Sequence, residues 1–80
     1  MARVLVKIDS SMYVRTLHNA SHTRKLIITP KETSGWDVRE ERDSTVVRDV
    51  HYDDWHRVER ARRTFALEAV SLSQEGWVET

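Results

Sequence analysis

The sequence predicts an α+β fold, a mostly antiparallel β-meander of four to five short strands followed by one C-terminal helix packed on the sheet. First, apolar and β-branched residues form short runs, some of them strictly alternating, as in half-buried strands. Second, turn-forming residues separate these runs. Third, apolar residues after position 53 recur at spacings of three and four, as on one face of a helix. Eighty residues allow a single small domain, with the sheet in residues 1–52, the helix in 53–76 and a tail in 77–80.

Three strands are expected before position 31. Residues 3–8 alternate, with Val4, Val6 and Ile8 on one face, and residues 12–17 are again β-branched and aromatic. A polar turn between these two runs would join them into a hairpin. Residues 18–24 lack an apolar period and are rich in turn formers, so we expect a loop there. The third strand, residues 25–29, ends at a proline, which has no amide hydrogen to donate to a ladder.

A second hairpin is expected from residues 36–42 and 45–52, and cross-strand chemistry indicates its register. A three-residue loop at 43–45 gives these pairs: Trp36 opposite Tyr52, Val38 opposite Val50, Glu40 opposite Arg48, and Arg42 opposite Val46. Favourable pairs of this kind contribute about 0.2 to 1 kcal/mol each, whereas a two-residue loop would place Val38 opposite Asp49. We therefore predict the three-residue loop, with a polar outer face on which Val47 is the exception.

The helix is expected to begin at about Asp54, because Asp53 and Asp54 can accept hydrogen bonds from the free backbone amides of a first turn. Gly76 marks its end. Trp77 follows the glycine, where an apolar residue commonly folds back onto the last turn, so we expect it to be largely buried. One apolar stripe of the helix should face the sheet, and Trp55 lies at its margin. The stripe consists of Val58, Ala61, Phe65, Ala69 and Leu72.

Composition excludes several classes of protein. The chain has no cysteine, so neither a disulfide framework nor a thiolate metal site is expected, and a cytoplasmic location is the default. No stretch approaches the roughly 18 apolar residues of a membrane span, and the N-terminus lacks the pattern of a secretory signal. Thirteen basic residues balance thirteen acidic ones, so the net charge indicates no partner.

Charge is nevertheless distributed unevenly along the chain. Residues 10–31 contain no acid and carry four arginine or lysine residues, whereas residues 32–54 carry eight acids and three arginines. A basic segment with an aromatic side chain can hold phosphates and stack a base, so weak nucleic-acid binding is the alternative function. Its candidate residues are Tyr13, Arg15, His18, His22, Arg24 and Lys25. The simpler interpretation, favoured by the neutral overall charge, is that these cations balance the acidic hairpin.

A second basic cluster falls in the first turns of the helix, where cations oppose the helix dipole. It comprises His56, Arg57, Arg60, Arg62 and Arg63. Nearby acids can compensate these charges: Asp53 and Asp54 precede the cluster, and Glu59 stands four residues before an arginine. We favour this structural interpretation, with an anion or partner site as the alternative.

Neither a metal site nor an active site is indicated. The most compact group of possible ligands is His51, Asp53, Asp54 and His56. Its spacing matches no metal motif, and the aspartates are better explained as helix caps. His18 and His22 have the spacing of a helical zinc site but lie in a loop-like segment. Asp49 and His51 could form an acid–base pair, but two such residues on one strand face are more often solvated neighbours. We therefore expect no enzymatic activity, no cofactor and no metal.

The remaining class of function is binding, and the sequence predicts a small non-enzymatic protein-interaction or regulatory module. Leu67 and Val70 point away from the apolar stripe, so they are candidate contacts together with His56 and Arg63. The expected partner is another protein or a second copy of the chain. Isolated exposed apolar residues are common, so the contrary interpretation is that the pair is incidental.

Overall fold

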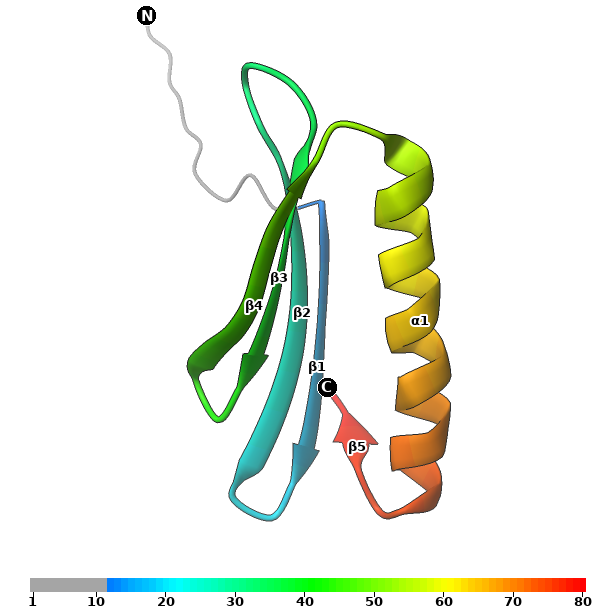
Figure 1. Cartoon of the computed structure of the whole chain (residues 1–80). Coiled ribbons are helices and arrows are strands. Elements are labelled where there is room, and N and C mark those ends of the chain that lie inside the picture. The colour runs from blue at the N-terminus through cyan, green and yellow to red at the C-terminus, as the bar shows by residue number, and fades with distance from the viewer. Residues whose placement is uncertain (1–11) are drawn as a thin grey trace, which may run out of the picture.

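Figure 1 shows the architecture in a computed structural model, which describes residues 12–80. Five antiparallel strands form one sheet in the order β4-β3-β2-β1-β5, and one helix packs on it. The elements are β1 (Tyr13–Asn19), β2 (His22–Pro30), β3 (Trp36–Arg42), β4 (Thr45–Tyr52), α1 (Trp55–Gln74) and β5 (Val78–Glu79). The predicted α+β fold is confirmed, and the strand expected over residues 3–8 lies outside the described residues.

Strands β1 and β2 form a longer hairpin than the sequence predicts. Residues 18–24, expected as a loop, continue both strands, and only Ala20 and Ser21 lie between Asn19 and His22. Ala20 has a φ of 55°, the left-handed conformation used by two-residue hairpin loops. The expectation of a loop is wrong because the backbone ladder continues through polar residues, which give no apolar period for a sequence pattern to detect.

The β3–β4 hairpin has the predicted register over most of its length. Val38 lies opposite Val50, and the ladder keeps this register as far as Glu40. Trp36 lies opposite Tyr52, and both side chains pack against the core. The apolar cross-strand pairs therefore face the helix.

The turn of this hairpin differs from the prediction. It is the two-residue loop Asp43-Ser44, with φ angles of 53° and 68°, as in a type I′ turn. Arg42 consequently lies opposite Thr45, and the predicted three-residue loop is wrong. A β-bulge at Val47 adds one residue to β4, and this residue restores the register that the apolar pairs favour.

Helix α1 begins and ends with the expected signals. The Asp54 carboxylate caps the N-terminus and accepts a hydrogen bond of 2.9 Å from the backbone amide of His56. At the other end Gly76 has a φ of 102°, and the amide of Trp77 donates to the carbonyl oxygen of Leu72 over 3.0 Å. These features define a Schellman motif, which ends the helix and returns the chain to the sheet.

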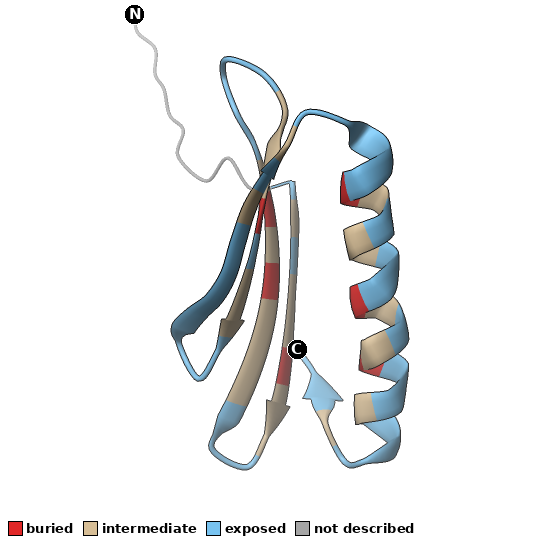
Figure 2. Cartoon of the chain, viewed as in Figure 1, coloured by how far each residue is buried: buried red, intermediate tan, exposed pale blue. Residues whose placement is uncertain are grey.

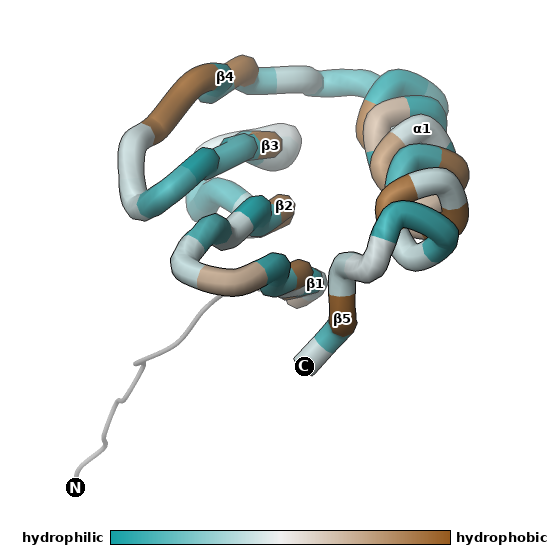
Figure 3. Tube along the Cα trace, turned by 90° about the horizontal axis from the view of Figure 1, so that it is seen from below, coloured by the Kyte–Doolittle hydropathy of each residue, from teal (hydrophilic) through white to brown (hydrophobic). Residues whose placement is uncertain are grey.

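The sheet and the helix form two layers around one core, as Figure 2 shows by burial and Figure 3 by hydropathy. Among residues 12–80, seven apolar side chains are buried: Leu17, Leu26, Ile28 and Val38 from the sheet, and Val58, Phe65 and Ala69 from the helix. All three helical residues of this core belong to the apolar stripe predicted from the sequence. Trp77 packs against this core but is only half-buried, not largely buried as expected, because it lies at the open flank of the two layers.

An aromatic pair holds the start of α1 against the sheet. The ring centroids of Trp36 and Trp55 are 5.1 Å apart, and their planes are inclined by 59°. Tilted aromatic pairs of this kind contribute about 0.5 to 1.5 kcal/mol beyond the area they bury. The pair thus fixes the first turn of the helix beside β3.

The residues after the helix, expected as a tail, contain a fifth strand. β5 pairs with β1, where Glu79 lies opposite Leu17 and Val78 lies opposite His18. In Figure 1 this short strand brings the C-terminus to the edge of the sheet beside β1. A strand of two residues has no periodicity, so pattern reasoning does not detect it.

Candidate binding grooves on either side of the helix

The residues predicted to contact nucleic acid are not brought together on one surface. Tyr13, Arg15 and Arg24 lie on the sheet face that meets the helix, alternating with residues that point the other way. Both arginines already form ion pairs there. Arg15 lies 2.6 Å from a carboxylate oxygen of Glu79, and Arg24 lies 3.2 Å from a carboxylate oxygen of Glu68. The Tyr13 ring lies 5.6 Å from a guanidinium group of α1. All three side chains are therefore occupied within the fold.

The other three predicted residues lie apart from these. His18 Nε2 is 3.1 Å from the hydroxyl oxygen of Thr80, and His22 Nδ1 is 3.3 Å from a carboxylate oxygen of Asp43. Lys25 lies on the opposite face of the sheet from Arg24 and has no carboxylate partner among the described residues. The acid-free segment thus forms no continuous basic surface in this part of the chain.

The basic cluster at the start of α1 is compensated only in part. Glu59 binds Arg62 with 2.5 Å between the charged atoms, and it does not bind Arg63 as expected. Asp53 binds a histidine of β4, and Asp54 caps the helix. Three helix arginines consequently have no carboxylate partner within residues 12–80: Arg57, Arg60 and Arg63.

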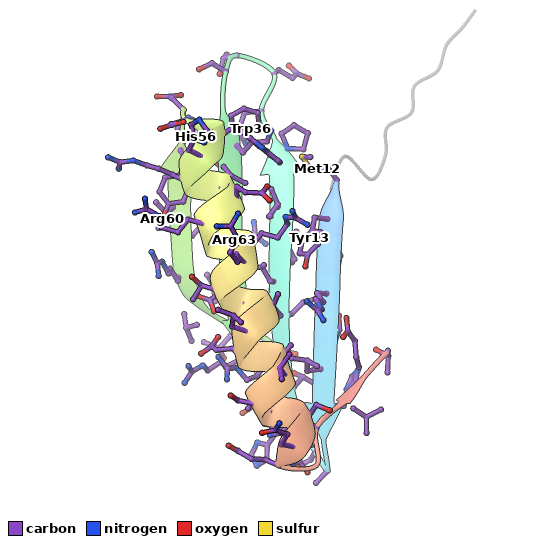
Figure 4. The ribbon with its side chains drawn as sticks, turned by 90° about the vertical axis from the view of Figure 1, so that its right-hand side faces the viewer. Met12, Tyr13, Trp36, His56, Arg60 and Arg63 are labelled. Carbon is purple, nitrogen blue, oxygen red and sulfur yellow. The ribbon has the colours of Figure 1, made fainter. Side chains whose placement is uncertain are left out.

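Two of these arginines line a groove between β4 and the first turns of α1, which we call the basic groove. Its volume is about 640 Å³, and it is lined by Arg48, Tyr52, Asp54, His56, Arg57, Arg60, Ala61 and Thr64. Figure 4 shows Arg60 extending from the β4 side of the helix, with His56 nearer the start of the helix. Arg48 reaches the groove from β4 and donates a hydrogen bond of 3.3 Å to the Tyr52 hydroxyl.

Arg48 is the member of this groove that sequence reasoning missed as a functional residue. It lies opposite Glu40 in the ladder, as predicted, yet the two side chains form no ion pair. The signal was present in the sequence, because the predicted register places Arg48 on the same strand face as Val50 and Tyr52. That face meets the helix, so a cation there lies beside the helix arginines.

A second groove lies on the opposite flank, between the C-terminal half of α1 and strands β1 and β5. This apolar groove has a volume of about 380 Å³ and is lined by Arg15, Leu17, Ala69, Val70, Ser73, Gln74, Trp77 and Glu79. Leu17 and Ala69 are buried, and Trp77 is half-buried. Trp77 was not among the predicted contact residues, because sequence reasoning assigned it to the core.

Of the four predicted protein-contact residues, Val70 lines the apolar groove and His56 lines the basic groove, whereas Leu67 and Arg63 line neither. Leu67 and Val70 are 68% and 58% exposed, so they point away from the core as expected. Arg63 is also exposed and is a helical neighbour of Leu67, four residues away. His56 lies about 16 Å farther toward the start of the helix than Leu67 and lines the basic groove. Three of the four residues therefore share one surface, and His56 does not.

A charged cluster joins both strands of the second hairpin to the connection before α1. His51 Nδ1 is 2.9 Å from Asp37 Oδ1, and His51 Nε2 is 3.0 Å from Asp53 Oδ1. Hydrogen bonding to Asp37, and then to Asp53, raises the pKa of His51 above its ordinary value. The same bonds lower the pKa of each carboxylate. Asp49, considered above as a partner of His51, instead binds Arg39 over 3.8 Å.

Within residues 12–80 no group of three or more histidine, aspartate and glutamate side chains is placed to hold a metal ion. No helix in this range combines the length and the apolar character needed to cross a membrane. The chain matches no protein-family model, no curated protein and no solved structure. Its function must be inferred from the two grooves.

Proposed function

We propose that the chain is a non-enzymatic protein-interaction module that binds a partner through the apolar groove and the side chains at its rim. The observation that carries this proposal is that Leu67 and Val70 remain 68% and 58% exposed beside a groove lined by Trp77. An exposed aliphatic pair next to a concave apolar surface is typical of protein–protein contacts.

The groove has the chemistry needed to receive a large apolar side chain from a partner. Val70 supplies exposed apolar surface over the buried Leu17 and Ala69, and the half-buried Trp77 supplies a rigid aromatic surface of the kind enriched at binding hot spots. The ion pair of Arg15 with Glu79 provides a polar rim. Burying the side chain of a residue such as Leu67 completely contributes about 1.5 to 3 kcal/mol relative to leaving it in water.

A matched pair of surface variants tests the proposal. The test variant is Leu67→Ser with Val70→Ser, and the control is Val46→Ser with Val47→Ser, an aliphatic pair that is 49% and 52% exposed on β4. None of the four positions is in the core, so both variants should keep the far-ultraviolet circular dichroism of the wild type.

Each protein is immobilised and exposed to extract of the source cells, and bound proteins are identified by mass spectrometry. We expect at least one partner that the wild type and the control retain and the test variant loses. If the two variants retain the same proteins as the wild type, or lose the same proteins, the apolar groove is not the binding surface.

A second copy of the chain is the other partner to test, by sedimentation equilibrium over a range of concentrations. A dimer that disappears only in the Leu67→Ser, Val70→Ser variant would identify the partner as the chain itself. Nucleic-acid binding through residues 10–31 is less well supported, because Arg15 and Arg24 already bind carboxylates.

A further inference from the structure

We propose that the basic groove binds the sugar–phosphate backbone of a single-stranded nucleic acid. This site is on the other flank of the helix from the apolar groove, and it contains none of the six residues that the sequence assigned to nucleic acid. Its principal cations are Arg48 from β4 with Arg57 and Arg60 from α1.

The first argument is that the charges of these three arginines are not neutralised by carboxylates of the described part of the protein. None of these three arginines has a carboxylate partner within the described range, in contrast to Arg24 and Arg62. Arg57 also stands in the first turn of α1, where the helix dipole disfavours a cation. The one acid in the lining is Asp54, whose carboxylate is engaged as the helix cap. A bound polyanion would supply the missing countercharge.

The second argument is the chemistry of the lining. A guanidinium group can bind a phosphate with two parallel hydrogen bonds, and it is less strongly hydrated than an ammonium group. The hydroxyl groups of Tyr52 and Thr64 add neutral hydrogen-bonding groups. Ala61 is the single aliphatic residue among those that line the groove, so no large aliphatic side chain is present to receive an apolar side chain of a peptide. The lining therefore favours phosphate over an amphipathic protein segment.

The third argument is shape. The groove has a volume of about 640 Å³, and its two walls are formed by β4 and by the first turns of α1. Arg57 and Arg60 line the groove about one helical turn apart, which is about 4.5 Å along the helix axis. This distance is comparable to the spacing of about 3.4 Å between successive nucleotides along one strand. A channel of cations between a strand and a helix suits one backbone rather than a duplex.

The groove lacks a free aromatic surface for base stacking. Tyr52 is half-buried against the core, and its hydroxyl accepts the hydrogen bond from Arg48. Binding should consequently depend on phosphates and hardly on base identity. It should also weaken as salt concentration rises, because each neutralised phosphate releases counterions.

Fluorescence anisotropy with a short labelled oligodeoxythymidylate tests the site. The test variant Arg48→Gln, Arg57→Gln, Arg60→Gln is compared with the control Lys25→Gln, Arg39→Gln, Arg42→Gln, which removes the same charge from other parts of the sheet. We expect the test variant to bind at least about tenfold more weakly with a shallower salt dependence, and the control to stay within about threefold of the wild type. Circular dichroism confirms that both are folded.

Three results would overturn the proposal. One is no binding by the wild type at low salt, and another is an equal loss of affinity in both variants, which would indicate net charge alone. The third is displacement by polyglutamate as effective as displacement by unlabelled oligonucleotide, which would indicate an acidic protein partner. The Leu67→Ser, Val70→Ser variant should retain full oligonucleotide affinity, so failure at the apolar groove and failure at the basic groove are distinguishable.

Discussion

The guanidinium group of Arg15 holds the carboxylate of Glu79 through two hydrogen bonds, one of 2.6 Å from Nε to Oε2 and one of 3.0 Å from Nη2 to Oε1. The ion pair joins β1 to β5 and lowers the pKa of Glu79. Both residues also line the apolar groove, next to Trp77. Together with the backbone pairing of β5 and β1, this pair therefore helps to position the C-terminal strand, which forms one wall of the groove.

Replacing the carboxylate, by Glu79→Gln, should loosen β5 without unfolding the domain. Because Glu79 is 43% exposed, the loss of unfolding free energy should stay below about 1 kcal/mol. The amide of Thr80, which donates to the Thr16 carbonyl oxygen over 3.1 Å, should exchange its hydrogen with solvent faster. Glu75→Gln is the control, because the Glu75 side chain has no partner among the described residues. Equal exchange rates in the two variants would show that the ion pair does not hold β5.

The cluster around His51 should make stability depend on pH. Its two carboxylate partners raise the pKa of His51 above its ordinary value of 6.5, so the folded state binds the proton more tightly than the unfolded state. The stabilisation is therefore fully present below the unfolded pKa and is lost as pH rises through the higher folded pKa. We expect the melting temperature to fall over that window, and His51→Gln to remove this component of the pH dependence.

An NMR titration of the His51 ring checks the cause directly. Asp37→Asn should lower the pKa of His51, whereas Asp49→Asn should leave it near the wild-type value, since Asp49 binds Arg39 instead. A wild-type His51 pKa at or below 6.5 would contradict the described contacts.

Gly35 is required by its surroundings, and Gly35→Ala should be strongly destabilising. Its φ is 77°, and an added Cβ would meet the Tyr52 carbonyl oxygen and approach Asp53 Oδ1 to 2.8 Å and His51 Nε2 to 2.9 Å. We expect a loss of more than about 2 kcal/mol in a urea titration. Gly76→Ala is the matched control, because its φ is 102° but nothing lies within 4 Å of the added atom. A loss for Gly35→Ala no larger than for this control would exclude the steric explanation.

The centre of the core can be tested with two substitutions in one helix. Phe65 is 2% exposed, so Phe65→Ala should lower the free energy of unfolding by about 3 to 5 kcal/mol. Leu67, two residues later, is 68% exposed, and Leu67→Ala should change it by less than about 0.5 kcal/mol. If Phe65→Ala prevents folding, Phe65→Leu should still fold with a loss below about 1.5 kcal/mol. Similar losses for Phe65→Ala and Leu67→Ala would contradict the helix orientation.

The elements that the sequence predicted well are those in which local pattern and packing agree. Val58, Phe65 and Ala69 repeat at helical spacing, and all three are buried. The pairing of Val38 with Val50 was predictable because a one-residue slip would have placed a valine opposite an aspartate. The turns were not predictable, because Ala20, Asp43 and Ser44 adopt positive φ in places where glycine or asparagine is the usual signal.

The candidate sites were harder to predict because they depend on distant partners. Arg24 was interpreted as a possible phosphate contact, yet its carboxylate partner, Glu68, stands 44 residues away. Which arginines remain unpaired depends on the packing of α1 against the sheet, and a linear charge count does not contain that information. Leu67 and Val70 were identified correctly as exposed, but the groove beside them is completed by Trp77, which the Schellman motif turns toward the sheet.

The bulge in β4 has a consequence for how copies of this chain behave at high concentration. β4 forms one border of the five-stranded sheet in residues 12–80, and it carries the exposed side chains of Val46 and Val47. A long, regular border of this kind is a template on which another chain can add a strand and begin to aggregate. The extra residue at Val47 breaks the even spacing of donors and acceptors, so an incoming strand can match only part of β4. We therefore expect the single inserted valine to hinder polymerisation through this edge of the sheet.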